Sequence, residues 1–177
     1  MKRLWAPWRM TYINEDPRPG CLFCRARNDP DDPDSELVVW RPEGAVVLLN
    51  KFPYNPGHVM VAPAAHKGDL ADLDDAESLA LMSALRTTLR VLRATLEPEG
   101  FNVGANLGRA AGAGIPDHVH IHVVPRWNGD TNFMPVISDV KIVNEHLQQT
   151  AAKLRPAFPT RRSHRPPSPR PCRPARQ

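Results

Sequence analysis

Alternating runs of apolar and polar residues predict five strands grouped around one long helix. Aliphatic and β-branched segments bounded by proline, glycine or asparagine are typical of strands. A Pro-Glu-Gly turn at 42–44 separates the first two segments and predicts a hairpin. The five predicted strands cover residues 36–41, 45–50, 58–62, 101–107 and 118–124.

The long helix is predicted over residues 74–96. Asp72, Asp74 and Asp75 can cap its N-terminus, and a Pro-x-Gly sequence follows its last turn. A closing helix is predicted over 140–154. Strands grouped around one long helix predict an α+β domain with a largely antiparallel sheet. The apolar residues that recur every three or four positions of the long helix, and that we expect in the core, are Leu79, Met82, Leu85, Leu89, Leu92 and Leu96.

Both ends of the chain depart from this pattern. Residues 1–35 are rich in proline, aspartate and arginine, which predicts an extended, turn-filled arm. Residues 156–177 carry six arginines, seven of the 20 prolines and no acidic residue, which predicts a disordered tail. The net charge of +4 belongs to this tail, since the remainder has 17 basic and 19 acidic residues. We therefore expect one domain at 1–155, with nucleic-acid binding at most weak and confined to the tail.

The chain lacks the apolar segments that membranes require. It has no apolar run long enough for a membrane-spanning helix, and its first residues include charges and a proline where a secretory signal has an apolar stretch. We therefore expect a cytoplasmic protein that does not act at a membrane.

Two of the three cysteines, Cys21 and Cys24, form a Cys-x-x-Cys sequence. In a reducing compartment this spacing indicates a metal or redox site before it indicates a disulfide.

The sequence HVHIHVV at 118–124 contains three of the seven histidines. Alternate residues of a strand share a face, so His118, His120 and His122 should lie together while the aliphatic residues between them face the core. Neighbouring imidazoles lower one another's pKa, and neutral imidazole is the form that a nucleophile or a metal ligand needs. One ion held by all three is disfavoured, because positions i, i+2 and i+4 span about 13 Å. The alternative is an exposed polar strand face without chemistry.

A glycine-rich loop, GRAAGAG at 108–114, comes shortly before these histidines. Glycines let the backbone approach a ligand closely, and successive N–H groups can bind phosphate oxygens. Asn50 and His58 flank a turn at 55–57 and bring polar groups toward the same sheet. His58 by itself would more often be structural, but the combination predicts a phosphate site beside a nucleophilic histidine.

These motifs together resemble the histidine triad (HIT) superfamily, whose signature is His-φ-His-φ-His-φ-φ with φ apolar. The resemblance is to its bacterial branch of diadenosine tetraphosphate phosphorylases. It covers residues 1 to about 155 and implies a HIT-like catalytic domain: a five-stranded, mainly antiparallel sheet with one long helix and a C-terminal helix. The segments that carry it are LWAPWRMTYI, CLFC, NKFPYNPGHVMVAP, HKGDLADL and FNVGANLGRAAGAGIPDHVHIHVVPRWNGDTNF.

The resemblance implies a role for each matching residue. The middle histidine, His120, would attack the α-phosphorus of a nucleoside polyphosphate and form a nucleotidyl-imidazole. His122 would act beside it, at the phosphates. The implied substrate contacts are Asn50 near the ribose, His58 and Asn106 at the phosphates, Ala113 and Gly114 through their backbone, and Trp127 near the substrate.

The resemblance also implies a structural zinc ion and a homodimer. Two thiolates need two further ligands for a tetrahedral zinc site. The family positions that complete it are occupied here by His66 and His118, which join Cys21 and Cys24. A reduced cysteine pair without metal is the alternative. No organic cofactor is implied, and family members pair through the long helix and an edge strand.

The implied reaction is phosphorolysis of diadenosine tetraphosphate to ADP and ATP, with inorganic phosphate as co-substrate. Gly114 departs from the family pattern, because related enzymes have Gln or Ser there to orient the leaving group or the incoming phosphate. Two alternatives therefore stay open. One is hydrolysis of dinucleoside polyphosphates or nucleoside phosphoramidates through the same intermediate; the other is a non-catalytic nucleotide- or zinc-binding module.

Overall fold

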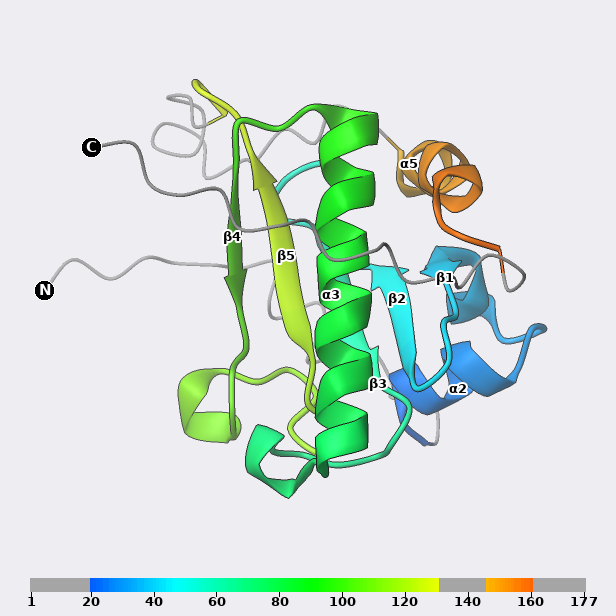
Figure 1. The fold of residues 1–177 in the computed structure, drawn as a ribbon, viewed down its shortest axis with the longest axis vertical. Helices are drawn as coiled ribbons and strands as arrows, with labels where there is room; N and C mark the ends of the chain where they lie inside the picture. Colours follow the sequence, from blue (N-terminus) through cyan, green and yellow to red (C-terminus); the bar gives the residue numbers. More distant parts are fainter. Residues whose placement is uncertain (1–19, 131–145, 161–177) are drawn as a thin grey trace, which may run out of the picture.

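The computed structural model describes residues 20–130 and 146–160, and it confirms the predicted α+β fold. The strands are β1 (Val38–Trp40), β2 (Ala45–Leu49), β3 (Val59–Pro63), β4 (Gly100–Gly104) and β5 (Ile121–Arg126). The helices are α2 (Leu22–Asn28), α3 (Asp75–Leu96) and α5 (Leu147–Leu154), and the 3-10 turns are η1 (Pro33–Leu37), η2 (Leu70–Asp72), η3 (Arg109–Ala111) and η4 (Arg155–Ala157). The strand order is β1-β2-β3-β5-β4, and each neighbouring pair is antiparallel. Figure 1 shows α3 running lengthwise along the sheet, with β4 at one edge.

The central strands β2 and β3 are buried along their whole length because helices cover both faces of the sheet. Alternate residues such as Val47 and Val61 belong to the core under α3 and α5. Their neighbours Leu48 and Met60 pack with Phe23 of α2 on the opposite face. Because both faces of these two strands are buried, their residues are apolar at successive positions and do not alternate with polar ones.

Helix α3 begins where the aspartates predict. Its N-cap is Asp74, whose side chain accepts a hydrogen bond from the Glu77 N–H at 2.8 Å, while the Glu77 side chain accepts from the Asp74 N–H at 2.9 Å. This reciprocal capping box satisfies two N–H groups that the first helical turn leaves unpaired. Within 20–130 and 146–160, neither this helix nor any other combines the length and apolar character needed to cross a membrane.

The predicted apolar face of α3 is wrong in the first half of the helix. Leu79 and Met82 are 68% and 49% exposed, whereas Leu81 and Ala84 pack into the core. Apolar residues occupy more than one stripe of this helix, so periodicity leaves its rotation undetermined until the sheet selects one side. The other predicted core positions do pack there, Leu85 and Leu92 fully and Leu89 and Leu96 partly.

Part of the predicted extended arm at 1–35 is instead the helix α2. Phe23 and Ala26, on one side of this helix, are fully buried against the sheet. Because most stability of a short helix comes from such tertiary packing, the polar composition of the segment conceals it in the sequence. Residues 1–19 of the predicted arm lie outside the described residues.

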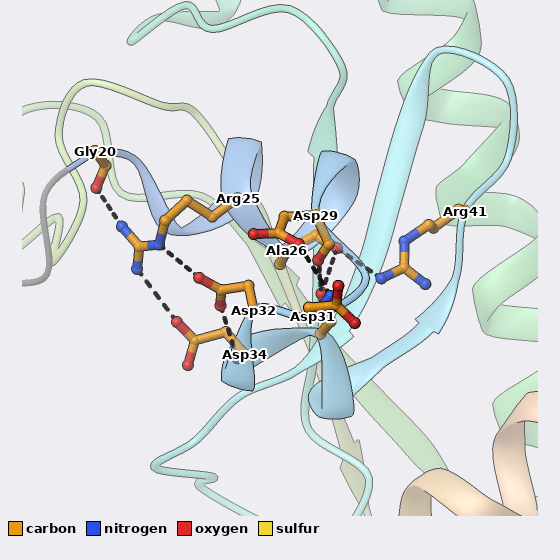
Figure 2. Close-up of polar contacts among 9 residues, drawn as sticks. Gly20, Arg25, Ala26, Asp29, Asp31, Asp32, Asp34 and Arg41 are labelled. Atoms are coloured by element: carbon orange, nitrogen blue, oxygen red, sulfur yellow. Dashed lines mark hydrogen bonds and ion pairs between the residues drawn. The ribbon is translucent and has the colours of Figure 1, made fainter.

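Arg25 fastens α2 to the turn η1 that leads into β1 (Figure 2). Its Nε donates to Asp32 Oδ2 at 3.0 Å and its Nη2 to Asp34 Oδ2 at 3.3 Å. Nη1 donates to the carbonyl oxygen of Gly20 at 2.6 Å. Asp32 and Asp34 are about nine-tenths buried, so these charge-assisted bonds are stronger than exposed ion pairs.

Strand β5 begins at Ile121, after two of the three histidines that we placed in it. The preceding residues are held by the loop that follows β3: the Val119 N–H donates to the Lys67 carbonyl at 2.7 Å. A hydrogen bond of 2.9 Å also joins His118 Nε2 to the Pro63 carbonyl. Contacts to the end of β3 and to the loop after it thus replace the ladder bonds of a longer strand.

The packed body continues beyond the boundary expected at residue 155. Phe158 is 4% exposed and stacks on Trp40 with 5.2 Å between ring centroids. The Trp40 indole N–H donates to the Pro159 carbonyl at 3.0 Å. Residues 140–145 of the predicted closing helix, and residues 161–177 of the predicted tail, lie outside the described residues.

Candidate functional site

The three histidines of HVHIHVV lie on the side of the sheet that α2 covers. The Phe23 ring centroid is 5.0 Å from that of His118 and 4.9 Å from that of His120. The residues between the histidines, Ile121 among them, contribute to the core under α3. The alternation of the sequence therefore predicts the side of each residue, although only His122 lies within β5 itself.

His120 presents one unprotonated ring nitrogen. Its Nδ1 lies 2.9 Å from the carbonyl oxygen of His118, and because a carbonyl can only accept, Nδ1 carries the proton. The side chain is 4% exposed, and this burial lowers the pKa of His120 despite the opposing effect of that hydrogen bond. The ring is therefore neutral, and Nε2 has the free lone pair that nucleophilic attack requires.

His122 has the opposite arrangement, with a proton on Nε2. The backbone N–H of Tyr54 donates to His58 Nδ1 at 3.0 Å, which leaves the His58 proton on Nε2. That nitrogen lies 3.1 Å from His122 Nδ1 and donates to it. Burial, and secondarily the nearby His120, lower the pKa of His122 to about 4. The neutral ring of His122 can therefore donate a hydrogen bond from Nε2.

A cavity of about 600 Å³ lies beside His122, near the β4 edge of the sheet. This volume is within the usual range for small-molecule sites. Among the predicted site residues, His122 and Asn106 line it. His120 does not, but its ring centroid is 4.9 Å from that of His122. The cavity wall consists of Tyr54, Asn55, Asn102, Val103, Gly104, Ala105, Asn106, Ala111, His122, Val124 and Arg126.

Several predicted substrate residues are engaged elsewhere. The Asn50 side chain accepts a hydrogen bond from the Phe52 N–H at 2.9 Å. The Ala113 N–H donates to the Gly108 carbonyl at 3.3 Å, within the glycine-rich loop. The residues that were predicted to contact substrate but do not line this cavity are Asn50, His58, Ala113, Gly114 and Trp127.

The cavity wall also contains a network of polar side chains that was not predicted from the sequence. Arg126 donates to both carboxylate oxygens of Asp130, at 2.6 and 2.8 Å, and to Asn102 Oδ1 at 2.7 Å. Asn55 Nδ2 also donates to Asp130, at 2.7 Å. Asn55 and Asp130 belong to Asn-Pro-Gly and Asn-Gly-Asp sequences, which read as ordinary turns. Only the fold brings the two turns together.

All four predicted metal ligands meet in one cluster, called here the Cys–His cluster. The ligand atoms of Cys21, Cys24, His66 and His118 all lie within 4.8 Å of one another. The distance from Cys21 Sγ to His118 Nδ1 is 3.2 Å, that from Cys24 Sγ to His66 Nδ1 is 3.5 Å, and that between the two Nδ1 atoms is 3.3 Å. Tetrahedral zinc with ordinary bond lengths separates two nitrogens by about 3.3 Å and a sulfur from a nitrogen by about 3.6 Å. The cluster therefore has the spacing to bind a metal ion.

The protonation of His118 also fits a metal ligand. Its Nε2 donates to the Pro63 carbonyl, so Nδ1, the atom that faces the cysteines, has the free lone pair. Burial lowers the pKa of His118, which favours the neutral ring. Burial also raises the pKa of the Cys24 thiol, so binding of a cation would have to displace its proton. The Arg25 contacts in Figure 2 hold the helix that contains Cys24.

Comparison with a family model identifies the domain. Residues 33–129, which include His58 and all three histidines of HVHIHVV, match the HIT domain. The chain belongs to the HIT domain family. Cys21 and Cys24 precede the matched segment, so the Cys–His cluster brings residues of the HIT domain together with the segment before it.

Other members of the HIT family are similar over most of this chain. An AP-4-A phosphorylase from Mycobacterium tuberculosis is 42% identical over 161 residues, covering 87% of this chain and 83% of that protein. A bis(5'-nucleosyl)-tetraphosphatase (asymmetrical) from Schizosaccharomyces pombe is 29% identical, covering 69% and 63%. The crystal structure of a zinc-bound histidine triad family protein from Mycobacterium smegmatis superposes with a TM-score of 0.61 at 29% identity, covering 78% and 92%.

Metal analysis tests the Cys–His cluster. We expect the purified HIT protein to contain about one divalent metal ion per chain, and Cys24→Ser to lose it, because four ligands complete a tetrahedral site. Cys172→Ser changes the third cysteine of the sequence, which lies outside the described residues and outside the predicted ligand set, and serves as the control. Folded protein without metal, or equal metal content in both variants, would contradict the assignment.

The depressed pKa of His122 predicts a loss of stability in acid. An unfolded chain binds this proton near pH 6.5 and the folded chain only near pH 4, so unfolding takes up a proton between these values. The free energy of unfolding should therefore fall as pH decreases through this window. Urea titrations at several pH values should show a steeper fall for the wild type than for His122→Asn. Parallel curves would contradict the expectation.

Proposed function

We propose that this protein cleaves dinucleoside polyphosphates by transferring a nucleotidyl group to His120, with phosphorolysis of diadenosine tetraphosphate to ADP and ATP as the overall reaction. The observation that carries the proposal is the neutral His120 ring, whose Nδ1 donates to the His118 carbonyl and whose Nε2 is free. The similarity to an AP-4-A phosphorylase over 83% of that protein supports the substrate class. The chain is thus an enzyme in this proposal.

In the first step, His120 Nε2 attacks the α-phosphorus of the bound dinucleotide. A bond forms between nitrogen and phosphorus, the bond from that phosphorus to the bridging oxygen breaks, and ATP leaves with the electron pair. No proton has to leave Nε2, because the tautomer already has it on Nδ1. The His118 carbonyl continues to accept from Nδ1 and stabilises the positive charge that develops on the imidazole.

His122 serves in this proposal as a hydrogen-bond donor to the phosphate oxygens. Its Nε2 proton is fixed by the chain of contacts from the Tyr54 N–H through His58, and the ring lines the cavity. Asn106, which also lines the cavity, would donate to the phosphates. We propose that Asn50 and Trp127 approach the nucleoside. The Ala113 and Gly114 backbone would bind phosphate once Ala113 exchanges its bond to Gly108.

In the second step, an oxygen of inorganic phosphate attacks the phosphorus, the bond to Nε2 breaks and ADP leaves. Water in place of phosphate would give AMP. Gly114 has no side chain to orient either acceptor, and the similarity to a bis(5'-nucleosyl)-tetraphosphatase supports hydrolysis as the second candidate. The 42% identity to a phosphorylase, over more of both chains, favours phosphate.

We propose that the metal of the cluster is zinc with a structural role. Cys21, Cys24, His66 and His118 would complete all four positions of a tetrahedral ion, which leaves none for substrate. Zinc would neutralise the thiolates and fix the helix α2 against the segment that contains His118. The free thiols of Cys21 and Cys24 are compatible with the reducing cytoplasm, where we place the protein.

We further propose a homodimer formed through α3 and the edge strand β4. Leu79 and Met82 of α3 and Val103 of β4 are exposed by 68%, 49% and 46%. Since β4 is the last strand in the sheet order, its outer edge has no partner strand within the described chain. A second copy would cover these apolar side chains and this edge together.

Product analysis tests the reaction. Diadenosine tetraphosphate incubated with the protein and inorganic phosphate should give ADP and ATP, whereas without phosphate the reaction should stop or turn to AMP and ATP. AMP and ATP under both conditions would establish hydrolysis instead. No product under either condition would favour a non-catalytic nucleotide-binding module.

His120→Ala should reduce turnover by at least about a thousandfold, because it removes the nucleophile. Nucleotide binding should persist, since the proposed phosphate contacts of His122 and Asn106 in the cavity wall remain. His146→Ala removes a histidine at the exposed N-cap of α5 and is the matched control. Rapid-quench experiments should recover AMP bound to the wild type and none bound to the His120 variant. An active His120→Ala enzyme would remove this residue from the mechanism.

Sedimentation equilibrium tests the dimer. The double substitution Leu79→Glu and Met82→Glu should shift the protein from dimer to monomer, because it places charges in the apolar contact. Leu70→Glu changes a similarly accessible leucine in η2 and should leave the dimer intact. A monomeric wild type, or a dimer that survives the double substitution, would contradict the proposed contact.

A further inference from the structure

A second cavity, of about 420 Å³, lies at the β1 edge of the sheet. It is bounded by β1, the turn η1 before it and the residues that follow α5. None of its lining residues belongs to the wall of the cavity beside His122, and β1 and β4 are at opposite ends of the strand order. The lining residues are Pro30, Ser35, Val38, Val39, Trp40, Arg41 and Arg155.

Two arginines of this wall are anchored by backbone carbonyls. Arg41 Nη2 donates to the Ala26 carbonyl at 2.7 Å, and Figure 2 shows its side chain reaching toward that residue. Arg155 Nε donates to the Val38 carbonyl at 2.9 Å, and its Nη2 donates to the carbonyl of Glu36. Each guanidinium is thereby held in place, with further N–H groups available, since arginine has five.

Neither Arg41 nor Arg155 forms an ion pair with a carboxylate within residues 20–130 and 146–160. They differ in this from Arg25, Lys67 and Arg126. Burial, and then the positive charge of Arg155, lower the pKa of Arg41, which is the effect expected of two cations near each other. An anion between them would relieve this repulsion.

Apart from Ser35, the rest of the wall is apolar, and packing holds its tryptophan in place. Trp40 is held on one side by its stacking on Phe158 and at its indole nitrogen by the Pro159 carbonyl. Val39 is 5% exposed and belongs to the main core. A ligand would therefore enter a preformed site with a cationic part and an apolar part, which lowers the entropic cost of binding.

We propose that this cavity binds a small phosphorylated molecule, whose phosphate lies between Arg41 and Arg155 and whose apolar part contacts Trp40. A phosphate offers several oxygens to two planar guanidinium groups and accepts paired hydrogen bonds from each. The site is independent of the proposed reaction at His120. It would give the protein a second position at which a phosphate ester is recognised.

The test uses phenyl phosphate, a phosphate monoester with a flat apolar part, and nuclear magnetic resonance at low ionic strength. The Trp40 indole N–H signal, assigned by its absence in Trp40→Phe, reports on this cavity alone among the described parts of the chain. It should shift saturably on titration. The apparent affinity should fall at least about tenfold in Arg41→Gln, which removes one charge-assisted pair of bonds.

Arg86→Gln is the matched control, because it removes the same charge from an exposed position of α3 that is not part of either cavity. It should bind phenyl phosphate as the wild type does. Arg41 is the preferred variant, since it has one backbone contact whereas Arg155 has two. No saturable shift of the Trp40 signal, or equal affinity in Arg41→Gln and Arg86→Gln, would overturn the proposal. Tighter binding of benzoate than of phenyl phosphate would overturn the assignment to phosphate.

Discussion

The hydrogen bond from His120 Nδ1 to the carbonyl oxygen of His118 is the contact on which the candidate site depends. It decides which nitrogen of the buried His120 ring is free. The residue that supplies the carbonyl is also the member of the Cys–His cluster whose own Nδ1 faces Cys21. His118 therefore connects the candidate metal-binding cluster, through its side chain, to the orientation of the proposed nucleophile, through its backbone carbonyl.

Two-sided burial of the sheet has a chemical consequence as well as a structural one. Phe23 of α2 packs with the inner strands, and its ring also lies close to those of His118 and His120. The same burial that stabilises the fold disfavours charged imidazole and keeps the histidine rings neutral. The seven residues of α2 thus contribute a core residue, a metal-ligand candidate and the low-polarity environment of the site.

Much of this arrangement is predictable, and the failures share a cause. The long helix, its aspartate cap, the five strands and the four residues of the Cys–His cluster follow from local spacing and from resemblance to a family. The rotation of α3 does not, because apolar residues on more than one stripe leave the buried side undefined until the sheet is in place. Helix α2 was not predicted because it is short and lies within an arm rich in proline, aspartate and arginine, and its packing through Phe23 depends on the sheet.

Residue spacing alone was enough to predict the five strands, the long helix and the side of the sheet that His120 and His122 occupy, because these depend on periodicity within one segment. The tertiary structure decided the rest. The tautomer of His118 depends on the carbonyl of Pro63, and that of His122 depends on the ring of His58, both distant in the sequence. The network around Asp130 and the pairing of Arg41 with Arg155 likewise arise only when distant segments meet, since a hydrogen bond or a shared cavity requires proximity that spacing does not encode.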